Sequence, residues 1–190
     1  MSYQLHPGDG FIFMKVGVHA QESLQDIIAR KQKELKDAGV SFWGYGGNTC
    51  HPTTKVQPFV STLVDKGREV YLCMNEMVSK HFADPVRADE FSADGGATWE
   101  KVPIGVNVLG SRYALVLKSL EPTDFELSLG HTKVGVGLQI GKSGAAYIQG
   151  RVDKACLEMT LDALTPPELD RVVKIGLAAK LDKPYAVLLR

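Results

Sequence analysis

The spacing of hydrophobic residues predicts alternating strands and helices in the first part of the chain. The run 11–16 is almost wholly apolar and follows a Pro-Gly-Asp-Gly turn, which predicts a buried strand. Over 24–38, apolar residues recur at helical spacing, and we expect the charged residues between them to face solvent. Ser23 and Gly39, on either side of this stretch, are typical helix caps. The segment therefore predicts an amphipathic helix, and the apolar run 40–45 predicts the next strand.

The pattern changes in the middle of the chain. Pro58 can open a second helix that stops at Gly67, and 69–74 predicts a third strand. From about 86 to 150 the sequence shows short apolar runs separated by turn residues and no good helix. This middle section is typical of antiparallel β-structure.

The last part of the chain carries a helix-start pattern. Thr-Pro-Pro-Glu at 165–168 combines a capping Thr, a Pro at the first helical position and a Glu, so we expect a helix over 165–181. The apolar run 185–189 predicts a final strand. The complete pattern predicts an α+β fold, with a small mixed sheet, two or three helices and an antiparallel β-rich section. We expect residues 1–190 to form a single globular domain.

The charge balance narrows the classes of partner. The chain carries 22 Lys and Arg and 22 Asp and Glu, so its formal net charge is zero. A phosphate-neutralising face usually brings a basic excess, so we expect no nucleic-acid partner. No apolar run approaches the ~20 residues of a membrane span, so we expect no membrane partner. A net charge of zero also removes electrostatic repulsion between copies of the chain, so the charge does not oppose a homo-oligomer.

The cysteines and the N-terminal residues bear on the cellular compartment. The chain has three cysteines, at positions 50, 73 and 156, and this pattern does not indicate a disulfide framework. The first ten residues have neither the basic nor the apolar region of a signal peptide. We therefore expect a cytoplasmic protein.

One local motif lies in the β-rich section, at 92–99. These residues carry the pattern Ser-x-Asp-x-Gly-x-Thr-Trp, in which Asp94 can accept hydrogen bonds from turn amides and Trp99 can pack beneath the turn. The segment resembles the Asp-box of sialidase-type propeller blades. This resemblance implies a structural β-hairpin over 86–102, and a single box does not imply sialidase activity, because a propeller needs several blades.

The segment 42–52 is the most unusual part of the sequence. It places aromatic residues, glycines, a Cys and a His just beyond a predicted strand, where open α/β sheets bind ligands. Trp43 and Tyr45 can stack on a planar ring. Gly46 and Gly47 allow backbone amides to approach a phosphate or carboxylate closely. These residues predict a ligand-binding loop, and the structural alternative is a turn whose aromatic side chains cover the core.

Three further residues can supply positive charge to an anionic ligand. His51 belongs to the loop itself, and His19 precedes the first predicted helix. Lys142 lies in a glycine-rich turn that could touch an anion. The first hypothesis is therefore a binding protein for a small, nucleotide-like or otherwise planar anionic ligand.

The second hypothesis is a phosphoesterase or group-transfer enzyme. Cys50 is a candidate nucleophile, and the triplets that begin at His51 and His131 are similar to the two His-x-Thr motifs of two-histidine phosphoesterases. Lys133 stands where that family has the second Thr, so one phosphate-binding hydroxyl is missing. The third hypothesis is a protein–protein interaction domain. The Cys and His spacings match no zinc site, so we expect no metal and no cofactor.

Overall fold

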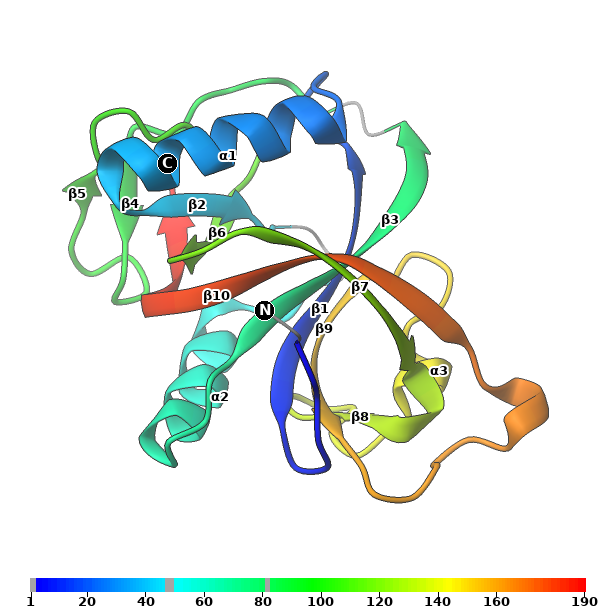
Figure 1. The fold of residues 1–190 in the computed structure, drawn as a ribbon. Coiled ribbons are helices and arrows are strands. Elements are labelled where there is room, and N and C mark those ends of the chain that lie inside the picture. Colours follow the sequence, from blue (N-terminus) through cyan, green and yellow to red (C-terminus); the bar gives the residue numbers. More distant parts are fainter. Residues whose placement is uncertain (1–2, 47–49, 81–82) are drawn as a thin grey trace. The chain divides into compact units, whose positions relative to one another are not determined.

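The computed structural model describes residues 3–46, 50–80 and 83–190. Within these residues, three α-helices and a mixed sheet of ten strands confirm the predicted α+β class (Figure 1). The described residues divide into two compact units. Unit 1 lies within 1–15, 49–76 and 121–178, and unit 2 lies within 16–48, 77–120 and 179–190. The single domain expected from the sequence stays a prediction.

Three long strands contribute residues to both units: β1 (Gly10–Val18), β3 (Tyr71–Lys80) and β10 (Val172–Leu189). Unit 1 further contains α2 (Thr53–Asp65), β7 (Glu121–Ser128), η1 (Leu129–His131), β8 (Thr132–Val134), α3 (Gly144–Tyr147), β9 (Lys154–Met159) and η2 (Pro167–Leu169). Unit 2 further contains α1 (Leu24–Ala38), β2 (Ser41–Gly44), β4 (Glu90–Ser92), β5 (Glu100–Lys101) and β6 (Tyr113–Leu117). None of the helices in this described part of the chain is long and apolar enough to cross a bilayer.

The core of unit 1 is built from antiparallel strand pairs. Strand β9 pairs with β1 on one side and with β8 on the other, and β7 pairs with the first part of β10. Large apolar side chains from these strands are fully buried, among them Phe11, Phe13, Leu157 and Ile175. These buried side chains form the hydrophobic core of unit 1.

Helix α2 begins earlier than the sequence predicts. Its N-cap is Pro52, so Pro58 lies inside the helix and the predicted start at Pro58 is wrong. The helix ends at the predicted stop, because Gly67 adopts a positive φ of 77°. The N–H groups of Gly67 and Arg68 donate to carbonyls of the last turn, which is the Schellman pattern. This reversal sends the chain directly into β3.

The predicted C-terminal helix over 165–181 is wrong. The Thr-Pro-Pro-Glu start forms only the short η2, and β10 begins at Val172. Val172, Val173 and Ile175 are β-branched and favour extended backbone, and their segment pairs antiparallel with β7. Tertiary pairing therefore overrides a local helix signal, while the predicted final strand forms the end of β10.

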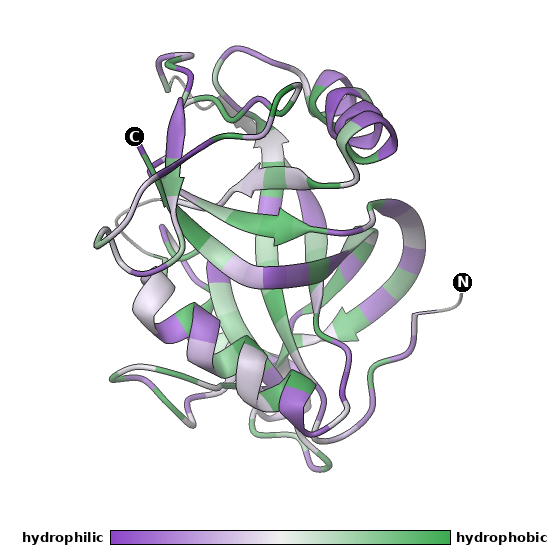
Figure 2. Ribbon diagram, turned by 90° about the vertical axis from the view of Figure 1, so that its left-hand side faces the viewer, coloured by the Kyte–Doolittle hydropathy of each residue, from purple (hydrophilic) through white to green (hydrophobic). Residues whose placement is uncertain are grey.

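Helix α1 of unit 2 forms as the caps predict. The side chain of Ser23 accepts a hydrogen bond from the N–H of Asp26 at 3.1 Å, and Gly39 closes the helix at a φ of 72°. The helix packs beside β2 (Figure 1). It is largely hydrophilic in the hydropathy view, because most of its surface faces outward (Figure 2).

The hairpin of β4 and β5 encloses the segment that resembles an Asp-box. The two strands pair antiparallel, with Glu90 opposite Lys101. Asp94 accepts hydrogen bonds from the N–H of Thr98 at 2.8 Å and from its hydroxyl at 2.5 Å, and the hydroxyl bond is the main cause that lowers the pKa of Asp94 to about 2. The indole N–H of Trp99 donates to a turn carbonyl. The relationship to sialidase-type blades stays a prediction.

Glu34 departs from the expected solvent-facing position on α1. It is only 3% exposed, and its carboxylate pairs with the equally buried Lys31 at 3.0 Å. It also accepts hydrogen bonds from the Ser41 hydroxyl at 2.6 Å and from the N–H of Asn107 at 3.0 Å. Burial lowers the pKa of Lys31 to about 8. The segment that carries Asn107 thus covers a charged side of the helix and is held there by this network.

Replacing Glu34 by Ala should strongly destabilise the protein. The variant leaves the Lys31 ammonium group buried without its counter-ion, which costs about 3–5 kcal/mol of unfolding free energy. In the control Lys33→Ala, which breaks an exposed pair with Asp37, the change should stay within about 1 kcal/mol. Urea unfolding measures both, and equal effects would contradict the role given to the buried pair.

Candidate functional site

The aromatic residues of the predicted loop lie in the interior of the protein. Trp43 is 4% exposed and Tyr45 is 1% exposed. Trp43 lies in β2, opposite Leu115 of β6, and the N–H of Tyr45 continues the pairing to the carbonyl of Tyr113 at 3.0 Å. Gly47, the second predicted amide donor, lies outside the described residues. The two rings therefore act as packing groups in this structure, and neither is open to solvent.

The glycines of this loop make room for another part of unit 2. A Cβ atom on Gly44 would lie 2.3 Å from the hydroxyl of Ser111, and one on Gly46 would lie 3.1 Å from the backbone nitrogen of Arg112. A side chain at position 44 would thus collide with Ser111, and one at position 46 would crowd the backbone of Arg112. The glycines at 44 and 46 thus face residues 111–113 of the protein, and the predicted approach of backbone amides to a ligand stays a prediction.

His19 supports the same turn. Its Nε2 atom lies 3.0 Å from the carbonyl oxygen of Leu109 and 3.4 Å from the Ser111 hydroxyl. A carbonyl only accepts, so Nε2 carries the proton in this contact. Gly110, between these residues, has a φ of 63° and lies against Ala20. His19 therefore holds the turn in place and, through Ser111, lies beside a pocket.

This pocket, called the arginine pocket below, has a volume of about 540 Å³, and the residues that line it include Asp84, Val86, Arg87, Ser111, Arg112 and Arg190. Within the described part of the chain, the guanidinium groups of Arg87 and Arg112 have no hydrogen-bonded or ion-paired partner. Arg190 donates to Glu90 at 2.7 Å and lies 4.1 Å above the Trp99 ring. The lining thus holds three arginines and one acidic side chain, Asp84, and one of the arginines, Arg190, is already paired with Glu90.

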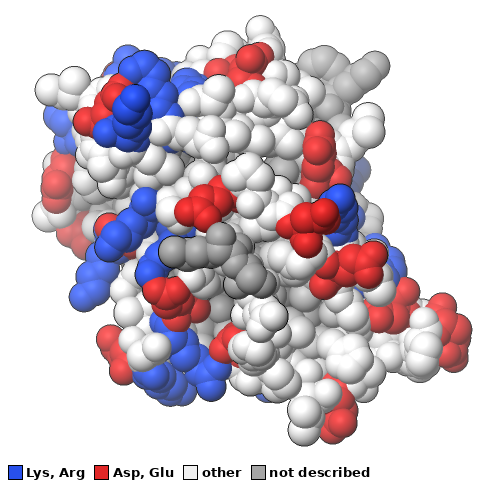
Figure 3. Space-filling model, viewed as in Figure 1, with Lys and Arg blue, Asp and Glu red and all other residues white. Residues whose placement is uncertain are grey.

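The sequence gives no signal for these arginines. Arg87, Arg112 and Arg190 are far apart in the chain and follow no motif. Only the pairing of the strands in unit 2 brings them to one pocket. Over the face drawn in Figure 3, by comparison, basic and acidic side chains are interspersed, without one large basic surface.

The remaining predicted residues lie in unit 1. His51 is 8% exposed and its ring stacks on Tyr147, with the centroids 5.9 Å apart and the planes 2° from parallel. Its Nε2 atom is buried and finds no hydrogen-bond partner among the described residues. Burial lowers the pKa of His51, so the imidazole is neutral at pH 7. A neutral, desolvated imidazole can accept a proton.

Two thiols lie near this histidine stack. Burial raises the pKa of Tyr147, and the charges of Cys156 and Cys50 raise it further. Burial also raises the pKa of Cys156, with a smaller effect from Cys50. These couplings place Cys50 close to both groups. The thiol of Cys156 stays protonated at neutral pH and is therefore a poor nucleophile.

His131 and Lys142 occupy other parts of unit 1. His131 ends η1 and lies near Asp170. Lys142 is exposed and closes the turn 135–142, where its carbonyl accepts from the N–H of Val134 at 2.8 Å. The predicted site residues are therefore divided: Trp43, Tyr45, Gly46 and His19 belong to unit 2, and Cys50, His51, His131 and Lys142 belong to unit 1.

Among the described residues, no group of three or more His, Cys, Asp or Glu side chains is arranged to hold a metal ion. The comparisons with known proteins add no relative. No protein-family model, no curated protein and no solved structure matches this chain.

His51 should make the stability of the protein fall in mild acid. Its pKa is depressed in the folded state, so between pH 6.5 and that lower value the unfolded state binds the extra proton. The unfolding free energy should therefore drop as the pH falls below 6.5, and His51→Phe should reduce this drop. Urea unfolding between pH 4.5 and 7.5 measures the difference. The control His6→Gln, at an exposed position, should keep the wild-type profile, and an unchanged profile for His51→Phe would contradict the assignment.

Proposed function

We propose that unit 2 binds a small anionic ligand in the arginine pocket, through a phosphate or carboxylate group. The observation that carries this proposal is the pair of guanidinium groups, on Arg87 and Arg112, without a partner in the described part of the chain. Guanidinium groups bind phosphate and carboxylate in a bidentate manner, with charge-assisted hydrogen bonds. The Ser111 hydroxyl, beside them, can add a neutral hydrogen bond.

The walls of the arginine pocket support a ligand larger than a bare ion. Val86 is 70% exposed and lines the pocket together with Ala88 and Leu189. These side chains offer apolar surface next to the arginines. A volume of about 540 Å³ lies in the range of small-molecule sites. A nucleotide-like ligand, with an anionic group and a flat apolar part, has this combination of properties.

Residues 42–46, which belong to the loop 42–52 singled out in the sequence, support the arginine pocket by packing. Gly44, at the end of β2, leaves room for Ser111, Gly46 lies against the backbone of Arg112, and His19 fixes the same turn. In this proposal Trp43 and Tyr45 stabilise the wall of the site by packing, and the arginines make the contacts with the ligand.

A second candidate function is proton transfer by His51 in unit 1. It is favoured by the buried Nε2 atom without a partner in the described residues. Hydrolysis of bis(p-nitrophenyl) phosphate at pH 7 tests it. Turnover that His51→Asn abolishes, with an unchanged melting temperature, would support an enzyme of the phosphoesterase class. Turnover that survives this substitution, or none in the wild type, would exclude His51 as a base for this substrate.

Anion binding should raise the melting temperature and depend on the two arginines. A ligand at 100 times its dissociation constant adds about 2.7 kcal/mol of stability. We expect AMP or cyclic AMP to do so more than adenosine at equal concentration. Because a hydrogen bond to a charged group contributes about 1.5–3 kcal/mol, Arg87→Gln and Arg112→Gln should each weaken binding about tenfold or more.

Arg151→Gln is the matched control, because Arg151 is an exposed arginine of unit 1. It should leave the affinity within a factor of two. Anion binding that is insensitive to both pocket substitutions would place the ligand elsewhere. A panel of phosphates, nucleotides and carboxylates without any shift would contradict the proposal and favour the protein–protein interaction domain.

A further inference from the structure

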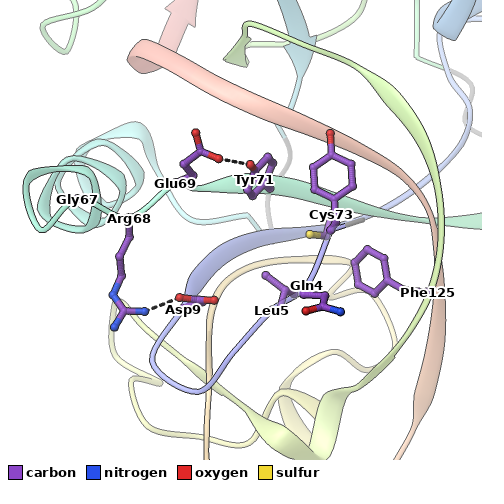
Figure 4. Close-up of a pocket in the computed structure, with 10 residues that line it drawn as sticks. Gln4, Leu5, Asp9, Gly67, Arg68, Glu69, Tyr71, Cys73 and Phe125 are labelled. Carbon is purple, nitrogen blue, oxygen red and sulfur yellow. Dashed lines mark hydrogen bonds and ion pairs between the residues drawn. The ribbon is translucent and has the colours of Figure 1, made fainter. Parts of the chain in front are cut away.

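Unit 1 contains a pocket beside its hydrophobic core, called the aromatic pocket below. The pocket has a volume of about 500 Å³. Its lining includes Tyr3, Gln4, Leu5, Tyr71, Cys73 and Phe125 (Figure 4). Cys73 is a buried member of the core, and Leu5, Tyr71 and Phe125 are partly buried and pack against it. An apolar group bound in the pocket would therefore extend the core of unit 1.

Three aromatic rings contribute to this lining. Tyr3 and Tyr71 meet edge to face, with ring centroids 4.8 Å apart and an angle of 84° between the ring planes. Phe125 of β7 supplies the third ring. Aromatic rings attract one another through offset-stacked or edge-to-face contacts, and a saturated ring does not form these contacts. An aromatic ligand would thus gain ring contacts in addition to the burial of its apolar surface.

The charged groups of the lining are already engaged within the protein. The carboxylate of Asp9 pairs with Arg68 and also accepts a hydrogen bond from the N–H of His6 at 2.8 Å. The carboxylate of Glu69 accepts a hydrogen bond from the Tyr71 hydroxyl, and Glu69 takes part in a further interaction. Figure 4 marks the ion pair and the Tyr71 hydrogen bond. A charged ligand would have to compete with these partners.

Burial in this pocket opposes a charge of either sign. It is the largest cause that raises the pKa of Tyr71, and it raises the pKa of the Cys73 thiol to about 12. The phenol and the thiol are therefore neutral at pH 7. The same loss of contact with water would penalise an ammonium or a carboxylate group on a ligand. The pocket is thus suited to an uncharged ligand.

The side-chain amide of Gln4 supplies a neutral polar group. Gln4 lines the pocket and is exposed, and its amide has no hydrogen-bonded partner in the part of the chain that the structure describes. A primary amide both donates and accepts hydrogen bonds. It can therefore bind a neutral amide or hydroxyl group on a ligand whose ring lies among the aromatic side chains.

We propose that the aromatic pocket of unit 1 binds an uncharged aromatic molecule, with its ring against Tyr3, Tyr71 and Phe125 and its polar group on Gln4. This site shares no residue with the arginine pocket, and its ligand is neutral where the ligand proposed for that pocket is anionic. Failure of one proposal would leave the other intact.

Four compounds of similar length separate recognition of the ring from recognition of charge. 3-Phenylpropanamide carries an aromatic ring and a neutral amide, and 3-cyclohexylpropanamide has a saturated ring instead. 3-Phenylpropanoate and 3-phenylpropylamine are the anionic and cationic counterparts. Each compound is titrated into the 190-residue chain at pH 7 and constant ionic strength, and binding is followed by amide chemical shifts.

The expected order of affinities follows from the walls of the pocket. 3-Phenylpropanamide should saturate shifts at residues 3–5, 67–73 and 121–126. It should bind about threefold or more tightly than the cyclohexyl compound, because only the aromatic ring gains the ring contacts. It should bind about fivefold or more tightly than either ion, because the ions lose hydration in the pocket.

Two variants of the pocket complete the test. Gln4→Ala lies at an exposed position, so the fold should survive, and it should weaken binding of 3-phenylpropanamide about threefold. Phe125→Leu removes one aromatic ring and should weaken binding about fivefold. Phe91→Leu is the matched control, because Phe91 is a partly buried phenylalanine of a strand in unit 2, and it should leave the affinity unchanged.

Four results would overturn the proposal. They are the absence of saturable shifts with 3-phenylpropanamide, equal or tighter binding of the cyclohexyl compound, equal or tighter binding of either ion, and full affinity in both Gln4→Ala and Phe125→Leu.

Discussion

The close approach of β2 to the turn before β6 is the contact on which unit 2 depends. Hydrogen-bonded strands hold the two segments together, glycine at position 44 leaves room for the Ser111 side chain, and a Cβ atom at position 46 would crowd the backbone of Arg112. The turn at 109–112 is then fixed by His19 from one side and opens to the arginine pocket on the other. The position of Ser111 at the arginine pocket is therefore set by packing against Gly44 and by the contact with His19.

Local signals in the sequence predicted much of the fold. The caps of α1, the stop of α2 at Gly67 and the apolar runs of the strands are properties of a few neighbouring residues, and the structure confirms them. The helix predicted in the C-terminal segment is wrong. The local helix signal of its Thr-Pro-Pro-Glu start competes with pairing to β7, which is distant in the sequence. The stabilisation from such a long-range pairing cannot be inferred from a few neighbouring residues, which is why the sequence predicted a helix there.

The candidate site was less predictable than the fold, for the same reason. The sequence drew attention to Trp43 and Tyr45, whose composition is unusual, but these rings are buried. It gave no sign of Arg87 or Arg112, since a lone exposed arginine outside the strands is typical of any surface. Glu34 shows the converse error, because a charged residue on an amphipathic helix is normally solvated and this one is covered. In each case the decisive quantity is burial in the folded chain.

The three strands that supply residues to both units have a consequence for how the chain reaches this structure. Each unit is assembled from separate stretches of sequence, so no single cut of the chain releases either one whole. Ribosomal synthesis therefore completes neither unit until the last strand, β10, has emerged. Pairings between such distant segments must close large loops before they gain stability, which slows folding. Until then the hydrophobic cores of both units lack the apolar side chains that β10 supplies, and chaperones that cover exposed strands would have most to protect during this interval.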